Sequence, residues 1–292
     1  TAAIQYFLND LHSAIPVSLY QYVDDTVIVT TANNFYEAIT LLQSAASKAM
    51  DWFRCNVINI NMSKTSLICL HNLLKKVTLD YPFILHCSDY SSCSCSPSQY
   101  SSVVKCLGLY IDSDLSWNSH LAYVCKRLRA VSCLLYNIRY NMPFSVRKMI
   151  AHALGYSILR YGITIYGHCA VRWHNRINRI LRSILKNISY DLNINSEKDI
   201  FKTLFMPNFN DLLIQAVVLK HIWFKEFLVP YVTSRSLRPK VRYWRPWCST
   251  KYATRIRAHC VPTYFKVLSP SIFRTKTKYK LKKLLRRICL QL

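Results

Sequence analysis

The chain has 292 residues, of which 51% are hydrophobic, and this is enough for a packed core and about two domains. Its formal charge of +25 at pH 7 indicates an acidic partner, most simply a nucleic acid backbone, although a basic surface can also serve solubility alone. The 12 cysteines are irregularly spaced and form no C-x-x-C pair, which argues against a disulfide framework and a zinc finger.

No stretch of the sequence predicts a membrane span or a secretion signal. The most apolar stretch, residues 211–229, is interrupted by two lysines, a histidine and a glutamate within the ~20 residues that a span needs. We therefore expect an intracellular protein, in the nucleus or the cytoplasm, that is not secreted and binds no membrane. Because the chain begins at Thr1 without an initiator Met, we expect it to be a piece of a longer polypeptide.

The first part of the chain mixes helix and strand signals. Apolar residues at helical spacing predict a helix over residues 2–15, which Pro16 ends. A strand–turn–strand is expected around Asp24 and Asp25, and a second helix is expected over residues 33–56, with Asn34 as its capping residue. Further β segments are predicted at residues 57–60, 66–71 and 75–81, a Ser/Cys-rich loop at 86–102, and a strand pair or a strand with a tight turn at 103–117.

From Asn118 onward the pattern becomes helical. Apolar residues from Leu121 to Ile138 advance by three and four, which is typical of one buried helix face. More helices are predicted over residues 144–160, 172–188, 208–228 and 278–292. The sequence therefore predicts an α+β fold with domains at residues 1–117, 118–229 and 230–292.

The run "LYQYVDDTVIV", residues 19–29, places two aspartates inside a stretch that otherwise has the pattern of a buried β-strand. Adjacent carboxylates repel each other and are costly to desolvate. Divalent cations bound at a hairpin tip would neutralise the pair and so explain its presence there. Mg²⁺ suits such ligands, and two Mg²⁺ ions can promote nucleotidyl transfer. The alternative is an ordinary surface β-turn, where Asp is also common.

"YVDD" at residues 22–25 resembles motif C of reverse transcriptases, and the order of the segments that follow resembles the non-LTR (LINE-type) retrotransposon enzymes most closely. The helix over residues 34–54, followed by "NINMSKTSLICL", resembles motif D, and "VKCLGLYIDSDLSWNSHL" resembles motif E. "LRYGITIYG" resembles a segment of their thumb, and "FLNDLHSAIP" resembles the helix after motif B. The resemblance implies a partial polymerase palm, an antiparallel sheet with helices, followed by a mostly helical thumb and C-terminal region.

The resemblance also implies catalytic roles. Asp24 would be a metal ligand of a two-Mg²⁺ site, and Asp25 would be a weaker or shared ligand. Lys64 would be the motif D lysine that donates a proton to pyrophosphate, although its position also suits an ordinary turn lysine.

Binding roles follow from the same resemblance. Tyr22 and Val23 would contact the primer terminus and the incoming nucleotide, while Leu107 and Gly108 would shape the primer grip. The implied partners are an RNA template, a DNA primer and a deoxynucleoside triphosphate. We expect the Asp24–Asp25 turn and residues 107–111 on the same side of one antiparallel sheet.

The sequence also departs from the family. The motif A aspartate and most of motif B are missing, and Asp10 cannot replace the former because it belongs to the helix after motif B. We therefore expect the chain alone to be inactive and to need the palm and fingers encoded upstream in the same polyprotein. The alternative is a non-catalytic remnant that binds nucleic acid.

The last part of the chain is strongly basic. Residues 227–292 contain 17 Lys and Arg and no Asp or Glu, and Tyr and Trp are interleaved among them. This composition suits a phosphate backbone with accessible bases, or else a solvated tail.

Overall fold

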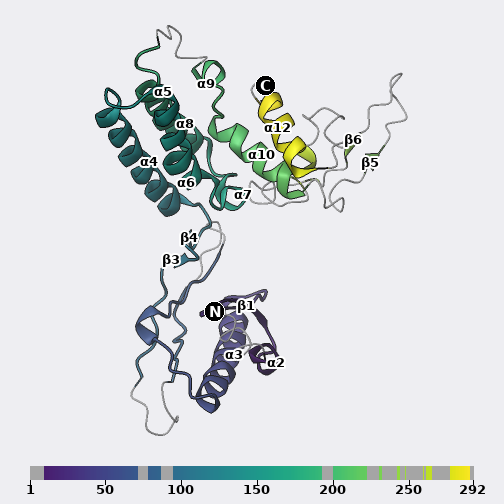
Figure 1. Cartoon of the computed structure of the whole chain (residues 1–292). Helices are drawn as coiled ribbons and strands as arrows, with labels where there is room; N and C mark the ends of the chain where they lie inside the picture. Colours follow the sequence, from purple (N-terminus) through teal and green to yellow (C-terminus); the bar gives the residue numbers. More distant parts are fainter. Residues whose placement is uncertain are drawn as a thin grey trace. The chain divides into compact units, whose positions relative to one another are not determined.

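The computed structural model describes residues 10–71, 78–86, 95–192 and 200–221, and beyond these residues 230–231, 242–243, 247, 259, 261–264 and 277–289. In this part of the chain helices dominate and strands form short antiparallel pairs, which is an α+β fold as predicted (Figure 1). The chain divides into two compact units, Thr1–Ser119 and His120–Leu292.

The first unit begins with a short helix and a β-hairpin followed by a long helix. The bounds are α2 (Leu11–Ala14), β1 (Ser18–Tyr22), β2 (Asp25–Val29) and α3 (Phe35–Cys55). The Asn34 side chain accepts a hydrogen bond from the Glu37 backbone N–H at 2.7 Å, so the predicted cap of α3 is confirmed. Residues 2–9 of the helix predicted over residues 2–15 lie outside the described residues.

Helix α3 packs against its surroundings on two sides. One side, with Ala45 and Ala49, contacts Leu11, Ile15 and Leu19 of the α2–β1 region. The other side, with Ile39 and Ala46, packs against Leu67 and Phe83. Since alanines leave room for close approach, α3 can serve as the centre of the unit for both the hairpin and the segment that follows.

The predicted strands after α3 do not form as regular strands in the described residues. In their place are a 3₁₀ turn, η1 (Met62–Lys64), and two isolated bridges, from Leu67 to Tyr100 and from Phe83 to Ser98. At Ile84 the backbone bonds instead to the Gln43 side chain, which donates to the carbonyl at 2.6 Å and accepts from the N–H at 3.0 Å. A side chain thus takes the place of a strand neighbour there.

A second hairpin, β3 (Val103–Cys106) with β4 (Leu109–Asp112), closes the first unit. It forms a separate two-stranded sheet from β1 and β2, so the expectation of one sheet carrying both turns is wrong within the described residues. The physical reason is that the segment between the hairpins makes single bridges, and no continuous strand there joins the two pairs.

The second unit is mainly helical. Its described elements are α4 (Asn118–Ile138), α5 (Phe144–Ile150), η2 (Ala151–Tyr156), α6 (Ser157–Arg160), α7 (Ile163–Tyr166), α8 (Val171–Ile188), α9 (Ile200–Thr203), α10 (Phe209–His221), β5 (Pro230–Tyr231), β6 (Arg242–Tyr243) and α12 (Lys278–Cys289). On α4 the predicted apolar stripe is buried, from Leu121 to Leu135. The helix predicted over residues 144–160 is interrupted, because η2 is a π-helical segment between α5 and α6.

The loop "LRYGITIYG" depends on two glycines. Gly162 has φ 69° at the start of α7, a left-handed conformation that glycine adopts without strain. At Gly167 a Cβ atom would clash with the Ile163 carbonyl oxygen and lie 2.5 Å from Leu213 of α10. The buried Tyr166 hydroxyl donates to the Leu159 carbonyl at 2.6 Å, and this bond fixes the loop across α7.

Candidate functional site

The two aspartates predicted as metal ligands lie at the tip of the β1–β2 hairpin. Tyr22 pairs with Asp25, so the loop between the strands consists only of Val23 and Asp24. The strand alternation places Leu19 toward the core and leaves Asp24 and Asp25 exposed. The structure thus places all four predicted residues of "YVDD" together.

Val23 has an unfavourable backbone conformation. Its φ of 58° lies in the left-handed region, whereas φ at Asp24 is negative, which is the pattern of a type II′ turn. Type II′ turns favour glycine at this first position, and a β-branched residue there is a genuine outlier. Such strain costs about 1–3 kcal/mol and is concentrated at functional sites.

The outer face of the hairpin differs from the sequence interpretation. Residues 19–29 have the pattern of a buried strand, yet Tyr20, Tyr22, Val27 and Val29 are exposed, and only the alternate positions face α3 and α2. The prediction of a buried strand is therefore wrong for these four residues. The reason is that one layer of helix covers only one face of a two-stranded sheet.

The aspartate pair fits part of a magnesium site. Neither carboxylate makes a hydrogen bond or ion pair with the described residues, so both keep their oxygens for a cation. Mg²⁺ in nucleotidyl-transfer sites binds one or two carboxylates together with water and substrate phosphates. Within the described residues, however, no three His, Cys, Asp or Glu side chains gather into a metal-binding group.

Lys64 ends the η1 turn. Its backbone N–H donates to the Asn61 carbonyl at 3.1 Å, and Thr65 Oγ1 donates to the same carbonyl at 3.1 Å. These bonds hold the turn, and the Lys64 side chain is exposed at its end.

Leu107 and Gly108 form the loop of the β3–β4 hairpin. Cys106 pairs with Leu109, so this loop also has two residues. Both have positive φ, 46° and 78°, which is the pattern of a type I′ turn. The predicted binding residues are thus placed on a second exposed hairpin tip.

The end of the second hairpin is fixed by an acidic cap. The buried Asp112 carboxylate accepts hydrogen bonds from Ser116 Oγ at 3.1 Å and from the Ser119 backbone N–H at 3.3 Å, at the start of α4. Asp114 Oδ1 accepts from the Ser116 backbone N–H at 3.0 Å. Two residues of the motif E-like segment therefore act in this structure as helix and turn caps.

The sequence reasoning missed a basic face on α8. Its arginines and lysine, Arg172, Arg176, Arg179, Arg182 and Lys186, are all exposed. The signal was present in the sequence, because steps of four, three, three and four residues place side chains on one side of a helix. In contrast, the side chains of the basic tail that was expected to bind nucleic acid lie mostly outside the described residues.

Two further observations concern the chain rather than this site. The described helices do not combine the length and apolarity needed to cross a bilayer. No family model matches the chain, and no curated protein and no solved structure shows significant similarity to it.

Proposed function

We propose that the chain is the part of an RNA-directed DNA polymerase, of the kind found in non-LTR retrotransposons, that carries the acidic hairpin of the palm and the thumb. The observation that carries this proposal is the pair of exposed carboxylates, Asp24 and Asp25, at the end of a strained two-residue loop. A strained loop that presents two acidic side chains with no bond to the described residues is well suited to bind a divalent cation with substrate.

In this proposal Asp24 and Asp25 hold Mg²⁺. When bound, the metal would lower the pKa of the primer 3′-hydroxyl and stabilise charge on the leaving pyrophosphate. Tyr22 and Val23 would orient the primer terminus and the nucleotide, since they precede the acids on the same hairpin. Lys64 would donate a proton to pyrophosphate, and the Leu107–Gly108 tip would position the primer.

The uncovered outer face of the β1–β2 hairpin supports a need for further polypeptide. Tyr20, Tyr22, Val27 and Val29 form an exposed aromatic and β-branched surface beside the acids. In the proposal, the palm encoded upstream covers this face and supplies the motif A aspartate. The 292 residues alone would then bind metal weakly and catalyse no extension.

The test is primer extension on a homopolymer RNA template with Mg²⁺. We expect none from the 292-residue chain, extension from a longer chain that includes the sequence encoded upstream, and loss of extension in Asp24→Asn of that longer chain. Asp51→Asn is the matched control, because Asp51 is an exposed aspartate of α3 whose ion-pair partner among the described residues is Arg54. Robust extension by the 292-residue chain, or retained extension in Asp24→Asn, would overturn the proposal.

A further inference from the structure

Helices α4 and α8 lie side by side (Figure 1), and a contact between a serine side chain of each is exposed to solvent. The hydroxyl oxygens of Ser132 and Ser183 are 2.9 Å apart, and the Asn187 side chain donates to the Ser132 carbonyl at 2.8 Å. Ser183 is exposed and Ser132 is half-buried. We call the exposed side chains of α4 and α8 on both sides of this serine pair the seam surface. It includes Arg129 and Tyr136 of α4 and Arg172, Arg176, Arg179, Arg182 and Lys186 of α8.

Positive charge dominates the α8 side of the seam surface. The five basic residues of α8 extend from Arg172 to Lys186, a rise of about 21 Å along the helix. Neither α4 nor α8 contains an aspartate or a glutamate in its sequence. The α4 and α8 side chains of the seam surface therefore carry positive charge and no negative charge.

Helix α4 adds charge to the same place. Burial raises the pKa of the Cys125 thiol, and the nearby guanidinium groups of Arg176 and Arg129 oppose that rise. Arg129 of α4 is exposed and lies one turn before Ser132, as Arg179 of α8 lies one turn before Ser183. Tyr136 is one turn after Ser132, so these three side chains flank the hydrogen-bonded serines.

Three exposed tyrosines lie around an arginine at the C-terminal end of both helices. Tyr136, Tyr140 and Tyr190 are 53%, 68% and 42% exposed. The Arg139 guanidinium is 3.7 Å from the Tyr136 ring centroid and 4.6 Å from that of Tyr140. The rings of Tyr140 and Tyr190 are 5.0 Å apart and nearly perpendicular.

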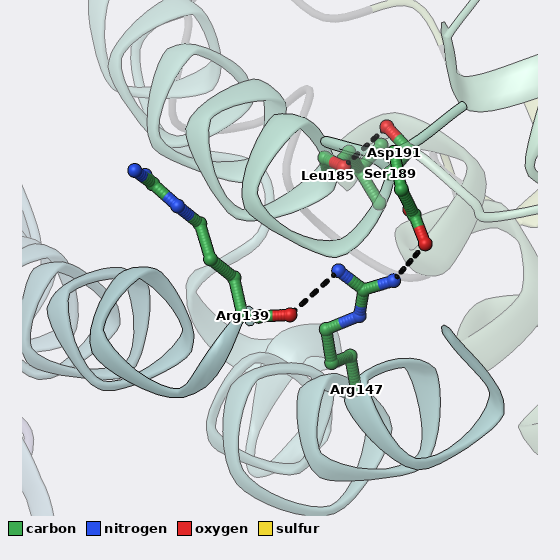
Figure 2. A network of polar contacts seen from close by, with 5 residues as sticks. All are labelled: Arg139, Arg147, Leu185, Ser189 and Asp191. Atoms are coloured by element: carbon green, nitrogen blue, oxygen red, sulfur yellow. Dashed lines mark hydrogen bonds and ion pairs between the residues drawn. The ribbon is translucent and has the colours of Figure 1, made fainter. Parts of the chain in front are cut away.

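A buried arginine holds this cluster in place. Figure 2 shows the Arg147 guanidinium between the Arg139 carbonyl oxygen and the Asp191 carboxylate, at 3.0 Å and 2.7 Å. Arg147 is 1% exposed and also lies 4.5 Å from the Tyr190 ring centroid. The ends of α4 and α8 are thus fixed before any ligand arrives, and the nearby Asp191 charge is paired.

The chemistry of the seam surface favours one kind of partner. A membrane surface would need an apolar face to insert, but the apolar side of α8 is buried within the unit, from Trp173 to Ile188. An acidic peptide would satisfy the arginines but would not use three tyrosine rings. Single-stranded nucleic acid has both regularly spaced phosphates and unpaired bases that stack on aromatic rings.

We propose that the seam surface binds single-stranded nucleic acid, with the phosphates along Arg176 and Arg179 and a base stacked in the tyrosine cluster. The inference rests on the proposed function only in that both have a nucleic acid partner, and it requires no polymerase chemistry. It assigns nucleic acid binding to α4 and α8, whereas the sequence alone suggested the basic tail.

The charge component is tested by fluorescence anisotropy of the full 292-residue chain with a labelled single-stranded RNA of mixed sequence. Arg176→Gln with Arg179→Gln should weaken binding about tenfold and make the salt dependence shallower by about 0.7 for each lost phosphate contact. Lys48→Gln with Arg54→Gln is the matched control, because it removes two exposed charges from α3. Equal effects of the two double variants would overturn the proposal.

The stacking component is tested with tyrosine variants against RNA and inorganic polyphosphate, which has no bases. Tyr136→Ser with Tyr140→Ser should weaken RNA binding about tenfold and leave polyphosphate binding unchanged, whereas the corresponding Phe pair should bind RNA as the parent does. Tyr36→Ser, at an equally exposed tyrosine of α3, is the control and should have no effect. Equal loss for both ligands, or equal affinity for double-stranded RNA, would overturn the proposal.

The two proposals fail in different ways. Asp24→Asn should leave RNA binding unchanged, so intact binding in an upstream-extended chain that extends no primer would overturn only the polymerase proposal. Intact extension together with unaltered RNA binding in the seam variants would overturn only the seam proposal.

Discussion

The two hairpins of the first unit have loops of the same length but with different residues. Both have two-residue loops between antiparallel strands, and both begin the loop with a residue at positive φ. The β3–β4 loop has Gly108 at its second position, where φ is 78°. The β1–β2 loop, Val23–Asp24, has no glycine at all.

The residues of the β3–β4 loop are explained by the backbone conformation of a tight turn, whereas those of the β1–β2 loop are not. Glycine adopts positive φ without strain, so Gly108 is explained by the hairpin alone. Valine at φ 58° is explained by no local preference, and the residues beside it are the two exposed acids. Val57, just after α3, has a similar φ of 55°, so it is the combination of this strain with two exposed acids that supports a functional hypothesis for the β1–β2 tip.

The largest expected effect is a loss of primer extension on changing an acid at the tip of the β1–β2 hairpin. In the upstream-extended chain, Asp24→Asn should lower primer extension by about a thousandfold or more, since it removes a charged group at the reacting centre. Far-UV circular dichroism should show an unchanged fold, because the Asp24 side chain has no bond to the described residues. A loss of activity that accompanies unfolding would count against the metal-ligand role.

The next effect concerns the glycine of the second hairpin. Gly108→Val should destabilise β3–β4 by about 1–3 kcal/mol, because a β-branched residue at φ 78° is strained. Amide hydrogen exchange of Val103–Cys106 and Leu109–Asp112 measures this as faster opening. Protection equal to that of the parent protein would show that the loop can adopt another turn type.

Val23→Gly should have the opposite effect on hairpin stability. It relieves strain in the first loop and should stabilise the β1–β2 hairpin by about 1 kcal/mol, seen as slower exchange of its amides. The same variant should extend primers more slowly in the longer chain, because the side chain proposed to contact the nucleotide is gone. Val27→Gly is the matched control, since Val27 is exposed in the extended part of β2 and glycine there should destabilise the strand.

The smallest effect is expected at Leu107. Type I′ turns favour Asn followed by Gly, so Leu107→Asn should stabilise the β3–β4 hairpin by about 0.5 kcal/mol. Val103→Asn, at an exposed position of β3, should destabilise it by a similar amount. The two variants can be ranked by exchange of the shared β3–β4 amides, and destabilisation by both would contradict the turn assignment.

The sequence by itself determined the elements whose causes are local. The Asn34 cap of α3, the buried stripe of α4 and the placement of Asp24 and Asp25 at a hairpin tip all depend on residues a few positions apart. Such periodicities and caps act within one or two turns, so they can be interpreted without knowing what packs against them.

Tertiary structure decided the features that depend on distant partners. It left the outer face of the β1–β2 hairpin exposed, replaced the strands predicted after α3 by isolated bridges, and introduced the π-helical segment within residues 144–160. It also fixed the tyrosine cluster through an ion pair between Arg147 and Asp191, which are 44 residues apart. No local pattern encodes such a contact, because its free energy depends on burial that exists only once α4, α5 and α8 have packed together.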